Sequence, residues 1–159
     1  MDSHEDEGFR TFDHTGDLGI EVWASSPERL FARAALAVLA QVAEIPGGAR
    51  GPAGASPIPE VPAGIPEVRI RIARSGTDPG DLLVDLCNAA LLEAEVGDAI
   101  WARADVTFPA PGRLDATLAG PRRDPRRQVF LREIKAVSHH DLELDLTPGR
   151  CRCRLVLDV

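Results

Sequence analysis

Residues 18–44 read LGIEVWASSPERLFARAALAVLAQVAE, and this stretch combines a strand with a helix. Over residues 18–23 every second residue is aliphatic, a pattern that is typical of a half-buried strand. Ser26 followed by Pro27 predicts a helix start, with serine as the N-cap and proline at the first helical position. The apolar residues that follow recur at helical spacing, so we expect this helix to run to about Glu44.

The same order of strand and helix then occurs a second time. Residues 68–72 alternate between branched aliphatic residues and arginine, and a second helix is expected from Asp78-Pro79 to Gly97. Only strands follow, with turns between them; they are expected over 101–108, 114–120, 134–146 and 151–159. This order predicts an α+β fold, a two-layer sandwich in which two α-helices cover one face of a mixed β-sheet.

The length of 159 residues suits one domain. Residues 1–8 are predicted to be a disordered acidic tail without the features of a signal peptide. Residues 9–159 then form a single domain, with a Pro/Gly-rich loop at 46–66 that we interpret as an insertion. Because no apolar run approaches the roughly 18 residues of a membrane helix, we expect a cytoplasmic protein that does not contact a membrane.

Charge and cysteine content restrict the possible functions. The net charge is −7 and the pI about 5.1, so non-specific binding to nucleic acid is disfavoured, and a partner protein would have to hold any RNA. The three cysteines, Cys87, Cys151 and Cys153, are an odd number without framework spacing, so we expect small core residues. The four arginines within residues 122–127 are more typical of a solvated loop than of an RNA contact.

The densest polar cluster is Asp13-His14-Thr15-Gly16-Asp17, just before the first long strand. Two carboxylates, a hydroxyl and an imidazole in one loop can supply ligands to a hard cation. Aspartate, threonine and glycine are also common in turns. From the residues alone, an ordinary turn is favoured over a cation site by roughly two to one, since oxygen-ligand sites lack a fixed spacing.

Two further polar features lie near the end of the sequence. Lys135, the only lysine, precedes His139 and His140, and because adjacent strand residues face opposite ways, only one of these histidines can point into a given site. Asp158 and the main-chain carboxylate of Val159 follow a strand of the predicted core and could present fixed oxygens to a cation. A solvated strand end is the common alternative.

Taken together, these segments resemble the archease family. Residues 13–20, DHTGDLGI, are similar to the family's His-Thr-Ala-Asp signature and the strand after it, with Gly16 in place of the usual alanine. Residues 134–142, IKAVSHHDL, resemble its Lys-Ala-(Ile/Val)-Thr-(Tyr/His)-His segment. The two predicted helices have the expected order, and the sequence stops one residue after Asp158, as archease sequences do.

The resemblance implies a function and a site. Archeases are protein cofactors of RtcB-type RNA ligases, which use GTP and a divalent metal such as Mn²⁺ to join RNA ends in tRNA splicing or RNA repair. An archease promotes guanylylation and multiple turnover of the ligase and is not itself an enzyme. Its divalent cation, Ca²⁺ in family structures with Mg²⁺ or Mn²⁺ as alternatives, corresponds here to Asp17, Asp158 and the main-chain carboxylate of Val159.

The remaining candidate residues are expected to support the site or to face the partner. They are His14, Lys135 and His140, together with Asp13, which has no firm counterpart in the motif. Two other classes of function stay open. A small metal-dependent hydrolase would use Asp17 and Asp158 as metal ligands and a histidine as general base, although no nucleophile is recognisable. A chaperone-like binding module would need an exposed apolar patch.

Overall fold

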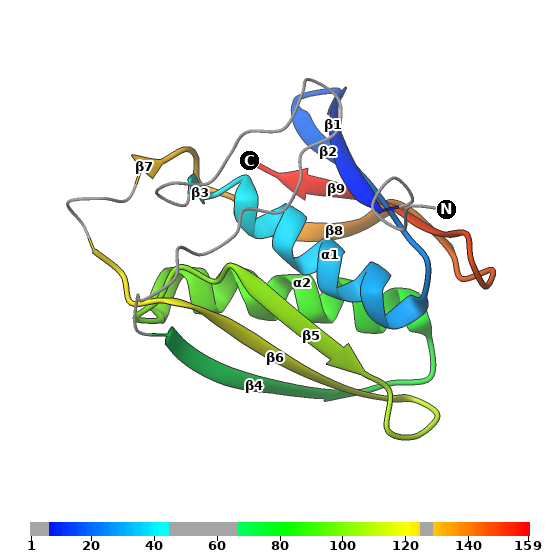
Figure 1. The fold of residues 1–159 in the computed structure, drawn as a ribbon. Helices are drawn as coiled ribbons and strands as arrows, with labels where there is room; N and C mark the ends of the chain where they lie inside the picture. Colours follow the sequence, from blue (N-terminus) through cyan, green and yellow to red (C-terminus); the bar gives the residue numbers. More distant parts are fainter. Residues whose placement is uncertain (1–6, 45–66, 125–128) are drawn as a thin grey trace.

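The computed structural model describes residues 7–44, 67–124 and 129–159 (Figure 1). These residues form two helices and nine strands. The helices are α1 (Pro27–Ala40) and α2 (Pro79–Val96). The strands are β1 (Gly8–His14), β2 (Asp17–Ala24), β3 (Ala43–Glu44), β4 (Glu67–Ser75), β5 (Arg103–Thr107), β6 (Arg113–Pro121), β7 (Val129–Phe130), β8 (Ala136–Asp145) and β9 (Cys151–Asp158). The predicted α+β class with two helices is confirmed.

The strands form separate antiparallel sheets, where a single mixed sheet was expected. One sheet has the order β1-β2-β9-β8, another the order β4-β6-β5, and β3 pairs with β7. All these pairings are antiparallel. A helix that connects two adjacent strands of one sheet makes those strands parallel, and neither helix makes such a connection.

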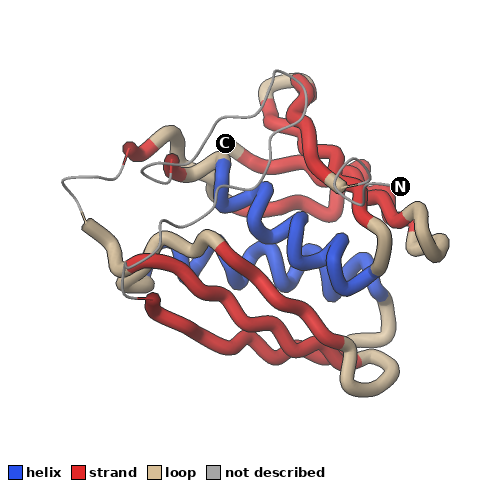
Figure 2. The backbone as a smooth tube through the Cα atoms, in the orientation of Figure 1, coloured by secondary structure: helices blue, strands red, loops and turns tan. Residues whose placement is uncertain are grey.

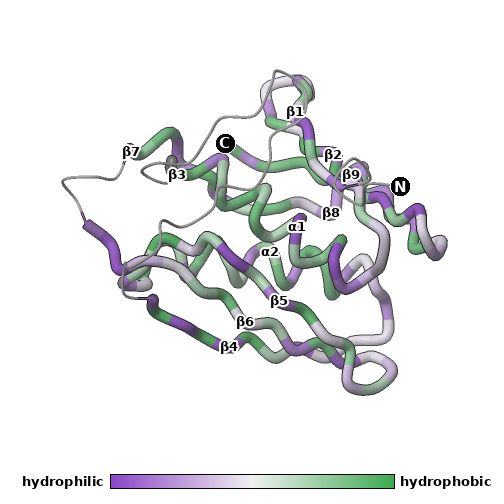
Figure 3. Tube along the Cα trace, viewed as in Figure 1, coloured by the Kyte–Doolittle hydropathy of each residue, from purple (hydrophilic) through white to green (hydrophobic). Residues whose placement is uncertain are grey.

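The helices lie between the two larger sheets, so the described fold has three layers where two were predicted (Figures 1 and 2). Helix α1 contacts β2 of the four-stranded sheet and β5 of the three-stranded sheet, while α2 contacts β8 and β4. Both helices therefore bury apolar side chains on two sides, which explains why so much of each helix is hydrophobic (Figure 3).

Both helix starts follow the sequence signals. The Ser26 hydroxyl accepts a hydrogen bond from the backbone N–H of Arg29 at 3.2 Å, and the Asp78 carboxylate accepts one from Gly80 at 2.7 Å. Helix α2 ends at Val96, as predicted. Helix α1 ends at Ala40, earlier than expected, because the chain turns there and residues 43–44 pair with β7.

One continuous hydrophobic core joins the helices to the inner faces of the sheets. Its largest fully buried side chains include Phe31, Ile20, Leu83, Leu118 and Leu155. Cys87, Cys151 and Cys153 are buried free thiols, which confirms their expected place in the core. Burial raises the pKa of the Cys153 thiol to about 12.

The last two residues of the predicted acidic tail are part of the folded domain. Residues 1–6 lie outside the described residues, but Gly8 begins β1, a strand that the sequence pattern did not indicate. The Glu7 carboxylate is ion-paired with Arg29 and with Arg33, the latter at 2.7 Å, and accepts a hydrogen bond from Ser25 at 3.1 Å. These contacts attach the start of the described chain to α1.

The predicted insertion at 46–66 lies outside the described residues. In the part of the chain that is described, neither helix is long and apolar enough to cross a membrane.

Candidate metal centre

The polar residues of the DHTGD segment lie at the tip of the β1–β2 hairpin. His14 ends β1, Asp17 begins β2, and the two residues pair across Thr15 and Gly16. Gly16 has φ +83, a left-handed conformation that suits glycine in a tight turn. The segment is thus a turn, and it holds the His14 and Asp17 backbones in fixed positions beside each other.

The strand register brings the end of β9 to the same edge of the sheet. Leu18 pairs with Leu157, so Asp17 and Asp158 occupy the next positions at that edge. Leu157 is fully buried, and side chains alternate along a strand, so Asp17 and Asp158 belong to the outer face. The backbone N–H of Lys135 donates to the carbonyl oxygen of Asp158 at 2.8 Å, which places Lys135 at this edge too.

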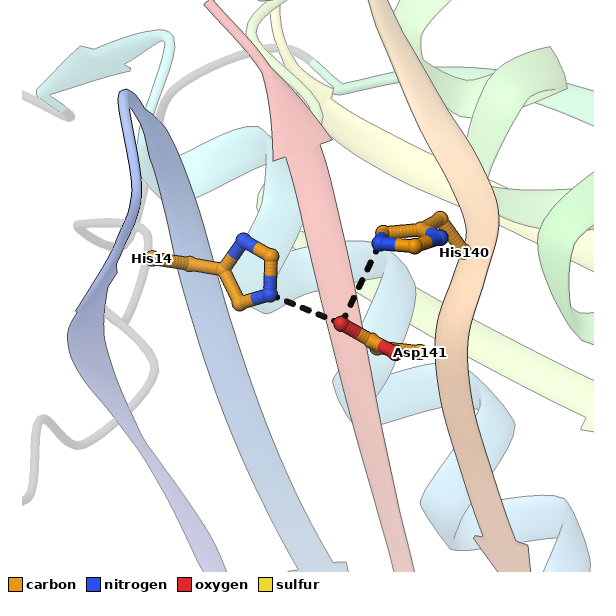
Figure 4. Close-up of side chains that lie close together, drawn as sticks. All are labelled: His14, His140 and Asp141. Carbon is orange, nitrogen blue, oxygen red and sulfur yellow. Dashed lines mark hydrogen bonds and ion pairs between the residues drawn. The ribbon is translucent and has the colours of Figure 1, made fainter.

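Three side chains make direct contact on this outer face. Asp141 Oδ2 lies 2.9 Å from His14 Nε2 and 3.3 Å from His140 Nε2. The two imidazole rings meet edge to face with centroids 6.0 Å apart. His14 comes from β1, whereas His140 and Asp141 come from β8, with β2 and β9 between them (Figure 4). We call this group the His-His-Asp cluster.

A β-bulge in β8 creates the cluster. The pairing of β8 with β9 shifts register between Ser138 and Glu143, and Asp141 has φ +54, unusual for a residue other than glycine. The bulge lets two consecutive residues, His140 and Asp141, reach the same side. His139 instead lies 3.1 Å from Asp81 in the first turn of α2, so of the two adjacent histidines only His140 contacts the cluster.

The electrostatics of the cluster favour an ionised carboxylate. A hydrogen bond with His14, and then the charge of His140, hold the pKa of Asp141 below its usual value. On the other side of its ring, the buried Nδ1 of His14 has no hydrogen-bond partner among the described residues. That nitrogen is 4.0 Å from Asp17 Oδ2, so His14 stands between two carboxylates.

The structure brings only some of the predicted site residues together. The register places Asp17 and Asp158 side by side, with Val159 beyond Asp158, while direct side-chain contacts link His14 and His140 to Asp141. Asp141 was not among the site residues predicted from the sequence. Its only sequence signal was its place directly after His140 in the IKAVSHHDL segment.

Asp13 and Lys135 are exposed near the same edge of the sheet. Of the arginine run, Arg122 pairs with Asp98 at 3.2 Å and Arg123 donates to the carbonyl of Ala94, while residues 126–127 lie outside the described part. The two described arginines therefore have partners within the chain.

This arrangement can be compared with known proteins. The model of the Archease protein family matches residues 9–159. The chain belongs to the archease family. It is similar to the protein archease of Methanopyrus kandleri, with 25% identity over 150 residues that cover 92% of this chain and 96% of the relative.

Two solved structures have a similar fold to this archease. The solution structure of Methanobacterium thermoautotrophicum protein 1598 has a TM-score of 0.67 and 22% identity, covering 96% of this chain and 99% of its own. The crystal structure of an archease, possible chaperone, from Thermotoga maritima has a TM-score of 0.55 and 20% identity, covering 93% and 94%. At these identities the likeness shows the fold.

Proposed function

We propose that this archease is a metal-binding accessory protein of an RtcB-type RNA ligase. It promotes guanylylation of the ligase by GTP and supports multiple turnover in tRNA splicing or RNA repair. The observation that carries the proposal is the register of β2 and β9, which in a chain of this family brings Asp17 and Asp158 to neighbouring positions. These are two of the positions at which the family resemblance implies a cation.

In this proposal Asp17, Asp158 and the main-chain carboxylate of Val159 hold one divalent cation, with Ca²⁺, Mg²⁺ or Mn²⁺ as the suitable ions. Carboxylates gathered at one sheet edge repel one another, and a hard cation with all-oxygen ligands removes that repulsion. The orphaned Nδ1 of His14, 4.0 Å from Asp17, supports the fit, because ligating carboxylates commonly have an outer hydrogen-bonding partner. The cation would neutralise charge where the protein meets the ligase.

The other residues at this edge position the ligands or contact the partner. His14 is held by Asp141 through its Nε2, and its Nδ1, 4.0 Å from Asp17, would serve as the outer partner of that carboxylate once Asp17 holds the cation. Lys135 is exposed beside Asp158 and would offer its ammonium group to a triphosphate or to an acidic group of the ligase. Asp13 and His140 are exposed and would lie at the contact surface. With a net charge of −7, the archease leaves RNA and GTP to be bound by the ligase.

The direct test is single-turnover guanylylation of the cognate RtcB-type ligase with GTP and Mn²⁺, with and without the archease. We expect strong acceleration by the wild type and loss of acceleration with Asp158→Asn. Asp105→Asn is the matched control, because Asp105 is an exposed carboxylate on the three-stranded sheet, away from the site. It should activate like the wild type.

No acceleration by the wild-type protein would contradict the proposal. Phosphodiester hydrolysis by the archease alone, lost in both Asp17→Asn and Asp158→Asn, would favour a metal-dependent hydrolase instead.

A further inference from the structure

We propose that the His-His-Asp cluster is a second cation site, distinct from the all-oxygen site proposed above, and that it takes a first-row transition metal of the Zn²⁺ class. Its ligand atoms are Nε2 of His14, Nε2 of His140 and Oδ2 of Asp141. This inference concerns metal binding by the archease alone, so it does not depend on ligase activation.

Two of the three separations between the ligand atoms are close to those in a metal coordination shell. Ligand atoms about 2.0–2.2 Å from Zn²⁺ lie roughly 3.0–3.5 Å from one another in tetrahedral or octahedral geometry. Asp141 Oδ2 is 2.9 Å from His14 Nε2 and 3.3 Å from His140 Nε2, and the three ligand atoms all lie within 4.8 Å of one another. A cation can therefore be held with small side-chain rotations and no movement of the strands.

The backbone supplies the ligands from rigid elements. His14 is fixed by its pairing with Asp17 at the end of β1, and His140 donates its backbone N–H to the Ser138 hydroxyl at 2.9 Å. The bulge with Asp141 at φ +54 presents a nitrogen ligand and an oxygen ligand from consecutive residues. In a regular strand these two side chains would face opposite sides, and the cluster would not form.

The ligand chemistry separates this site from the oxygen site. Two imidazoles and one carboxylate suit Zn²⁺, Co²⁺ or Ni²⁺, whereas Ca²⁺ and Mg²⁺ prefer oxygen ligands. Three protein ligands leave coordination positions for water or for a group from another molecule. The exposure of the side chains, 22% for His14, 71% for His140 and 56% for Asp141, keeps those positions open to solvent.

The test is a titration of the full-length, metal-free archease with Zn²⁺ by isothermal calorimetry in a large excess of Ca²⁺. A parallel titration with Co²⁺ follows its visible absorption, which reports the coordination geometry of the bound ion. We expect one Zn²⁺ per chain that Ca²⁺ does not displace, and affinity at least about 10-fold weaker in His140→Ala and in Asp141→Asn. Asparagine tolerates the left-handed backbone, so Asp141→Asn preserves the bulge.

His139→Ala is the matched control, because it removes the neighbouring exposed imidazole, which contacts Asp81 and not the cluster. It should bind Zn²⁺ and Co²⁺ like the wild type, and so should Asp158→Asn. Displacement of Zn²⁺ by Ca²⁺, equal loss in His139→Ala and His140→Ala, or no binding by the wild type would each overturn the proposal. Circular dichroism of every variant identifies a loss caused by unfolding, and a variant that unfolds is replaced by His140→Gln.

Discussion

The side-chain amide of Asn88 exchanges two hydrogen bonds with the backbone of Val137. Asn88 Nδ2 donates to the Val137 carbonyl at 3.1 Å, and the Val137 N–H donates to Asn88 Oδ1 at 2.8 Å. The pair joins the middle of α2 to the part of β8 just before the bulge. It thereby fixes the strand that carries His140 and Asp141 against the helix layer.

Replacing Asn88 with alanine should destabilise the fold. Val137 is buried, so the substitution leaves its N–H and C=O without these partners, and we expect a loss of about 1–3 kcal/mol in the free energy of unfolding. Urea denaturation measures this loss. Gln41→Ala is the control, since that side chain makes one longer hydrogen bond to a helix carbonyl and should cost less. Equal stability of Asn88→Ala and the wild type would contradict the role given to Asn88.

Glu7 should stabilise the protein at neutral pH but not in acid. Its ion pairs, chiefly with Arg29, lower its pKa from 4.5 to about 2. Because folding lowers this pKa, the stabilisation is complete above the ordinary value and is lost as the pH falls towards 2. We expect Glu7→Gln to cost about 1–3 kcal/mol at pH 7 and clearly less at pH 3.

Urea denaturation of Glu7→Gln and wild type at both pH values provides the test. Glu95→Gln, at an exposed position on α2, should change stability little at either pH. A cost of Glu7→Gln that is the same at pH 3 and pH 7 would show that the carboxylate charge does not contribute.

Gly19 should not tolerate a side chain while Phe12 is present. A Cβ at Gly19 would overlap the Phe12 ring, whose centroid lies 4.1 Å from the Arg154 guanidinium carbon. Gly19→Ala must displace that ring, and we expect a cost of about 1–3 kcal/mol. In a double-mutant cycle, the same substitution made in a Phe12→Ala background should cost much less. Additive effects would mean that the overlap with Phe12 is not the cause.

Calcium should raise the thermal stability of the archease through the oxygen site. A ligand that binds only the folded state contributes about 2.7 kcal/mol when its concentration is roughly 100 times Kd. Thermal unfolding with and without Ca²⁺ should show a rise in Tm for the wild type and for Asp105→Asn. Asp17→Asn should show little or none. An equal rise in Asp17→Asn would place the calcium elsewhere.

The sequence predicted the helices well because their start signals are local. Ser26-Pro27 and Asp78-Pro79 cap α1 and α2 as expected, since a cap depends only on neighbouring residues. The end of α1 at Ala40 depends on the pairing of residues 43–44 with β7, a distant contact that periodicity does not report. The division into separate sheets is likewise set by long-range pairing.

Part of the candidate site was predictable for the same reason, because the turn between His14 and Asp17 is local. The neighbouring positions of Asp17 and Asp158 depend on long-range pairing of β2 with β9, and only the family resemblance pointed to them. Asp141 was missed because alternation along a strand places it opposite His140. A bulge with Asp141 in a left-handed conformation cancels this alternation, and a single sequence contains no pattern that predicts such a bulge.

The place of β9 inside its sheet has a consequence for how the protein is synthesised. All strands of the three-stranded sheet are encoded before residue 122, but β9 lies between β2 and β8 and is made after both. Until Cys151–Asp158 emerge, the β1–β2 hairpin and β8 have no strand to join them, and each presents an unpaired edge. A chain truncated before β9 would therefore lack the strand that joins the His14 side of the sheet to the Asp141 side, and its exposed edges would make it prone to aggregation.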